Sequence, residues 1–245
     1  MCNLRFFYLL PLLLTSCAKD PVPGAYQAAI RAQGYVAYNQ PTGDPRNIND
    51  WNKLGPGTIL RSAGKTHYFP AKTLIGEEGV KKAMEPAHAS PIDLFSNRKV
   101  SGYDFDGKGG WTLDAVNQIA ASLDVKKVTD VEIKFGKAWL ANALSEGELH
   151  QAIARSPDLD AVTKRALMKK QFVVVQNAVF TESVRYTFKQ STEAGASATY
   201  KLTAQEIAAL QAKGFSVIDG GVDVSEPRFI AFTPVPDVAD DVKRK

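Results

Sequence analysis

The clearest hydrophobic pattern lies in the second half of the chain, where apolar and polar residues alternate. Residues 131–135 alternate valine, isoleucine and phenylalanine with glutamate and lysine, and residues 184–188 alternate in the same way. A period of two predicts β-strands with one buried and one solvated face. The longer run 171–180, QFVVVQNAVF, is almost continuously apolar and predicts a buried strand.

Helical segments separate these strands. Two are expected near 145–155 and 158–169, on either side of a serine-proline break. A third begins at Thr203, which forms a capping box with Glu206, and ends at Gly214. The predicted order from 125 to 233 is β-α-α-β-β-α-β, which resembles a ferredoxin-like arrangement. The expected single core comprises Val131, Ile133, Phe135, Val173, Val175, Val184, Tyr186, Phe188, Ile207, Leu210 and Phe229.

The first half of the chain is richer in loops. It predicts a short helix over 25–33, a strand at 35–38, a hairpin over 58–69 and a helix over 77–84. The fold class expected for the whole chain is α+β, with a mixed or antiparallel sheet that has helices on one face.

The first residues, MCNLRFFYLLPLLLTSC, form a separate apolar segment. Arg5 precedes an apolar run over 6–14 that is shorter than the roughly 20 residues needed for a membrane-spanning helix. These proportions are typical of a secretory signal peptide. The alternative to lipid modification is an ordinary secreted protein that is cleaved after the triplet Ser16-Cys17-Ala18.

Leu14-Thr15-Ser16-Cys17 resembles the lipobox of bacterial lipoproteins. The resemblance implies acylation of the Cys17 thiol, cleavage before this residue and a lipid anchor in the membrane. Cys17 is also the only cysteine outside the leader, and leftover odd cysteines are unusual in secreted proteins. Ala18 follows in place of the aspartate that resembles an inner-membrane retention signal. The expected location is therefore the cell outer membrane, facing the periplasm.

Composition and chain organisation limit the partners. The formal charge is +4, and loss of Arg5 with the leader lowers it by one. No Lys/Arg-rich run with interleaved aromatic residues is present, so a nucleic-acid partner is not expected. The predicted organisation is a signal peptide over 1–16, a tether over 17–24, a mixed N-terminal part over 25–110, an α+β module over 111–235 and a flexible tail over 236–245.

Candidate chemistry is sparse. The three histidines lack the spacing of a zinc site, and no G-x-S-x-G nucleophile motif occurs. Asp104 and Asp106 in YDFDGKGG resemble the start of a calcium loop, but Lys108 and Ala115 occupy positions that should carry oxygen ligands. A glycine-rich turn is the favoured interpretation, and no cofactor is expected.

The predicted function is a non-enzymatic envelope lipoprotein that binds or assembles with an envelope protein or glycan. The alternative is a hydrolase acting on peptidoglycan or another envelope glycan through paired carboxylates. Its candidates are Asp104 or Asp106 together with Glu77 or Glu78. A raised carboxyl pKa within a cleft would distinguish the enzyme from the binding module.

Substitution of Cys17 tests the lipidation hypothesis. Cys17→Ser should abolish incorporation of a labelled fatty acid, because a serine hydroxyl cannot form the thioether. The wild-type chain should carry the label under the same conditions. Equal labelling of the two proteins would contradict acylation at this residue.

Overall fold

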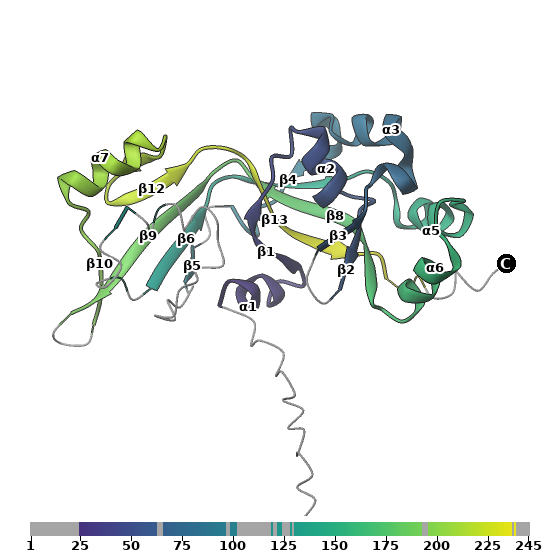
Figure 1. Ribbon diagram of the computed structural model, residues 1–245, viewed down its shortest axis with the longest axis horizontal. Helices are drawn as coiled ribbons and strands as arrows, with labels where there is room; N and C mark the ends of the chain where they lie inside the picture. The colour runs from purple at the N-terminus through teal and green to yellow at the C-terminus, as the bar shows by residue number, and fades with distance from the viewer. Residues whose placement is uncertain are drawn as a thin grey trace, which may run out of the picture.

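The computed structural model describes residues 25–62, 66–96, 99–101, 119, 122–123, 128, 130–192, 196–236 and 238. Within them the chain forms two antiparallel sheets, a large sheet of seven strands and a small sheet of six. The two sheets lie end to end in an elongated molecule (Figure 1). The coarse α+β class is confirmed, but two antiparallel sheets replace the single sheet that the sequence predicted. The ferredoxin-like arrangement expected for the second half is wrong, because its strands are divided between the two sheets.

Three long runs of chain pass from one sheet into the other. They are β6 (Asp130–Phe135) with β7 (Ala138–Asn142), β8 (Phe172–Thr181) with β9 (Val184–Ser191), and β12 (Gly221–Val224) with β13 (Arg228–Pro234). In the large sheet β8 pairs with β7 and β13, and in the small sheet β9 pairs with β6 and β12. The run β8–β9 is therefore the central strand of both sheets.

The remaining strands extend the two sheets. The large sheet contains β1 (Val36–Thr42), β2 (Ile59–Arg61), β3 (Thr66–Phe69) and β4 (Ala89–Pro91). The small sheet contains β5 (Lys99–Ser101), β10 (Ser197–Thr199) and β11 (Ser216–Ile218). The expected hairpin over 58–69 is confirmed by the pairing of β2 with β3, although its tip at 63–65 lies outside the described residues.

Six α-helices and one short 3₁₀ helix occur in the described part of the chain. The α-helices are α1 (Ala25–Arg31), α2 (Ile48–Leu54), α3 (Lys72–Ala83), α5 (Glu146–Arg155), α6 (Ala161–Met168) and α7 (Ala204–Ala212), and the 3₁₀ helix is η1 (Pro86–His88). The capping box of Thr203 and Glu206 is present at α7 as expected. Helix α7 lies at the end formed by the small sheet, and α2, α3, α5 and α6 lie at the opposite end (Figure 1).

The small sheet has the strand phase that the alternation predicts. Val131, Ile133 and Phe135 of β6 are fully buried, and the apolar residues of β9 face the same core. Helix α1 covers this face, because the ring of Tyr26 packs edge-on against Phe135 at 6.2 Å. The Tyr26 hydroxyl also donates a hydrogen bond of 2.8 Å to the Ile230 carbonyl oxygen. Leu210 of α7 belongs to the same cluster.

The expectation of one continuous core is wrong. Val175 and Phe229 belong to a second cluster, on the large sheet, and Val173 packs against that cluster. Ile207 is half-buried and belongs to neither cluster. The reason is that β8 and β9, which the sequence analysis assigned to one core, contribute to different sheets.

Opposite faces of β6 should respond very differently to truncation. Phe135→Ala should lower the free energy of unfolding by about 3–5 kcal/mol, as expected when a buried aromatic residue is removed. Glu132 lies on the other face, where its carboxylate is 3.7 Å from the Lys189 ammonium. Glu132→Ala should cost about 1 kcal/mol or less, because partly exposed ion pairs contribute little. Urea denaturation of both variants measures the difference, and equal losses would contradict the observed strand phase.

Candidate functional site

The residues predicted to carry chemistry are not brought together by the described structure. Cys17, Asp104 and Asp106 lie outside the described residues. Glu77 and Glu78 are exposed on α3, where Glu78 forms an ion pair of 2.8 Å with Lys81. In the part of the chain that the structure describes, no cluster of three or more His, Cys, Asp or Glu residues could hold a metal ion.

A charge pattern that the sequence analysis did not use points to a different surface. The segments 51–76 and 161–181 each contain four basic residues and no acidic residue. Each segment is bounded by acidic residues, so neither stands out in the overall charge balance. Their absence of carboxylates becomes informative only when the fold places the two segments side by side.

Strand pairing joins these segments at one end of the large sheet. Strand β2 pairs antiparallel with the start of β8, so that Arg61 lies opposite Phe172. The Ser62 amide donates a hydrogen bond of 2.8 Å to the Gln171 carbonyl oxygen, which extends this pairing by one residue. Lys170, two residues after the end of α6, has a φ of 56°, a left-handed conformation that turns the chain sharply toward β8. Strand β3, paired to β2, forms the edge of the sheet (Figure 1).

Aromatic rings lie among these cations. The Tyr68 ring on β3 packs over the Phe172 ring with centroids 4.2 Å apart, and Phe69 contacts Tyr68 edge-on at 4.6 Å. Tyr68 remains 38% exposed, whereas Phe172 is buried beneath it. We call the surface formed by Arg61, His67, Tyr68, Lys169 and Lys170 the basic edge.

The charges of the basic edge are not neutralised within the described residues. No ion pair involves Arg61, Lys169 or Lys170 in the part of the chain that the structure describes, and all three side chains are exposed. Partial burial and the nearby Lys53 ammonium lower the pKa of His67 below its ordinary value. The polar face of the small sheet differs, because Arg185 lies 3.9 Å from Asp223 and Lys189 lies 3.7 Å from Glu132.

This arrangement is suited to binding anionic groups at an interface between water and an apolar phase. Exposed ammonium and guanidinium groups attract phosphates, and tyrosine is favoured where one end of a side chain is apolar and the other is wet. No helix in the described residues combines the length and apolarity that crossing a bilayer requires.

The chain resembles a known protein in structure, but no match to a protein family is found. No protein-family model matches the chain, and no curated protein matches it. Among solved structures, a bacterial gasdermin from Bradyrhizobium tropiciagri matches with a TM-score of 0.49 and 8% sequence identity. The match covers 88% of this chain and 87% of that chain.

The match corrects two expectations from the sequence. The likeness is to a bacterial gasdermin and not to a lipoprotein family, so the recognition of this chain as a member of a bacterial lipoprotein family was wrong. Acylation of Cys17 itself is not tested by this likeness and stays a prediction. The predicted non-enzymatic envelope binding or assembly module is overturned by the same finding, together with its hydrolase alternative. The leader that suggested both lies outside the described residues.

His67 should make stability depend on pH. Its pKa in the folded state lies below the ordinary 6.5, so the unfolded chain binds more protons between the two values. The contribution of neutral His67 to the free energy of unfolding should therefore be fully present above pH 6.5 and be lost as the pH falls through the folded-state pKa.

Urea midpoints at pH 7.5 and pH 5.0 measure this effect, and His67→Gln should reduce the difference between them. His88→Gln is the matched control, because His88 lies on η1 and is not part of the basic edge. An identical pH dependence in wild type and His67→Gln would contradict the assignment.

Proposed function

We propose that this protein acts at a lipid membrane and that it docks on anionic lipids through the basic edge. The observation that carries the proposal is the pairing of two acid-free basic segments around exposed Tyr68. This function replaces the binding or assembly module that the sequence predicted.

The size of the electrostatic attraction is sufficient for reversible docking. Each Lys or Arg near an anionic membrane surface contributes about 1 kcal/mol at physiological ionic strength. Arg61, Lys169 and Lys170 would together supply roughly 3 kcal/mol before any contribution from Tyr68. Tyrosine is enriched at the headgroup level of membranes, so its exposed ring would add to this attraction.

The action we propose at the membrane is permeabilisation. The small sheet is strongly two-faced: one side carries the apolar residues of β6 and β9, and the other carries paired charges. The apolar side is covered in part by the short helices α1 and α7, of seven and nine residues. If lipid displaced these two short helices, the apolar side of the small sheet would lie in the bilayer while its charged side stayed hydrated.

An acylated Cys17 would hold the protein against the same membrane, which we propose to be the outer membrane seen from the periplasm. The residues from 18 to 24 span at most about 25 Å when fully extended. They lead into α1, whose last residue Arg31 lines one hollow together with Ser62 at the end of the basic edge. An anchor on Cys17 would therefore leave the basic edge within reach of the bilayer. An envelope protein or glycan bound in addition belongs to the same proposal.

Vesicle binding tests the docking surface. The chain should partition onto vesicles that contain phosphatidylglycerol, bind phosphatidylcholine vesicles much more weakly, and lose affinity as salt is raised. The double variant Arg61→Glu/Lys170→Glu should bind the anionic vesicles at least about 30-fold more weakly, because two attractive charges are removed and two repulsive ones are added.

The control variant is Lys82→Glu/Lys201→Glu, which makes the same charge change at two exposed lysines away from the basic edge. Its net charge falls by the same amount, but the basic edge is intact, so it should bind the anionic vesicles clearly better than Arg61→Glu/Lys170→Glu. Equal loss of binding in the two variants would mean that only net charge matters and would overturn the assigned surface.

Release of an entrapped dye from the same vesicles measures permeabilisation. Binding to the vesicles without dye release would overturn the proposal that the protein permeabilises the membrane.

A further inference from the structure

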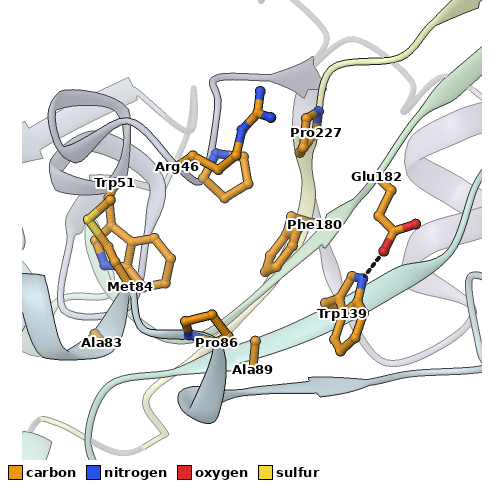
Figure 2. Close-up of a pocket in the computed structure, with 11 residues that line it drawn as sticks. Arg46, Trp51, Ala83, Met84, Pro86, Ala89, Trp139, Phe180, Glu182 and Pro227 are labelled. Carbon is orange, nitrogen blue, oxygen red and sulfur yellow. Dashed lines mark hydrogen bonds between the residues drawn. The ribbon is translucent and has the colours of Figure 1, made fainter.

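A pocket lies where the three long runs of chain bend from one sheet into the other. It has a volume of about 410 Å³. Trp139 follows the bend at 136–137, Glu182 lies within the bend at 182–183, and Pro227 lies within the bend at 225–227; all three line the pocket. Figure 2 shows these side chains on one side and Trp51, Met84 and Pro86 on the other.

The walls of the pocket are apolar and mostly rigid. Trp51 comes from α2, Met84 ends α3, Ala89 begins β4 and Phe180 lies on β8, so four separate elements contribute. Rings dominate the lining, since two tryptophans, one phenylalanine and several prolines form it. Flat, rigid walls of this kind favour a flat ligand over a flexible chain.

The two charged residues of the lining have partners at the rim. The Arg46 guanidinium donates hydrogen bonds to both oxygens of the Asp44 carboxylate, from Nε at 2.9 and 3.1 Å and from Nη2 at 2.7 Å. The Glu182 carboxylate accepts a hydrogen bond of 2.9 Å from Nε1 of Trp139. In Figure 2 the Arg46 guanidinium points away from Trp51, Met84 and Pro86. Both charged residues of the lining are therefore already hydrogen-bonded, and the rest of the pocket is largely apolar. Burial of a charged ligand there would be unfavourable.

We propose that this pocket binds an uncharged molecule built of one to three rings, and that the ligand holds the two sheets at their present bend. An uncharged ring compound is expected because rings dominate the lining and both charged lining residues already have partners. An effect on the bend is expected because one ligand would contact residues beside all three bends at once. A ligand that binds only this arrangement stabilises it by mass action. The proposal stands apart from membrane docking, because the pocket and the basic edge share no residue.

The test uses N-phenyl-1-naphthylamine, a neutral ring compound whose fluorescence rises in apolar surroundings, with the full chain in solution and without lipid. Titration should give saturable binding to the wild type, and saturating probe should raise its melting temperature. Ala89→Phe should weaken binding at least tenfold and remove the temperature shift, because the new ring fills the pocket from β4.

Ser90→Phe is the matched control, since Ser90 follows on the same strand but is exposed and does not line the pocket. It should bind the probe within about twofold of wild type. Met84→Trp fills the pocket from a different element and should reproduce the loss if Ala89→Phe does not fold. Absence of saturable binding to the wild type overturns the proposal, as does equal binding by wild type and both filling variants. Binding without a rise in melting temperature overturns the proposed effect on the bend.

Discussion

The antiparallel pairing of three long chain runs is the constraint on which the rest of this structure depends. Because β8–β9 is central in both sheets, its neighbours must bend where it bends. The junction is tightly built: the Gly136 amide donates to the Ser183 carbonyl oxygen at 2.9 Å, and the Thr181 hydroxyl donates to the same oxygen at 2.9 Å. A Cβ atom on Gly136 would lie 2.3 Å from the Ser183 hydroxyl oxygen and 3.3 Å from the Ser183 backbone nitrogen, so a larger residue would require the Ser183 side chain to move.

The two surfaces to which we assign roles follow from this scaffold. The basic edge exists because β2 pairs with the first residues of β8, which joins two acid-free segments that are about a hundred residues apart in the chain. The pocket exists because the bends of all three runs meet beside the layer formed by α2 and α3. One feature lies at the edge of the large sheet and the other at its junction with the small sheet. A protein that must meet a membrane and also change its shape would gain from this separation, because docking leaves the bend free to respond to a ligand.

The corrected recognition has a physical cause. The secretion and acylation machinery recognises a leader and its lipobox as linear sequence. Such a segment therefore predicts where a protein is sent, and it says nothing about how the rest of the chain folds. Packing is preserved by the alternation and volume of apolar residues, and these can be kept while nearly every residue changes. Short linear motifs therefore do not reveal how the part of the chain after the leader folds.

Local sequence determined the elements and their phase. The alternation over 131–135 gave the buried face of β6 correctly, the capping box at Thr203 gave the start of α7, and the run 58–69 gave the hairpin of β2 and β3. These features depend on residues within a few positions of one another, so the chain alone specifies them. Tertiary structure decided which strands share a sheet. The junction at 182–183 divides one predicted core into two, and no local pattern marks it, because the hydrogen bonds that set the bend come from strands distant in the sequence. The basic edge has the same origin: its charges are visible in the chain, but only long-range pairing places them on one surface without a neighbouring carboxylate.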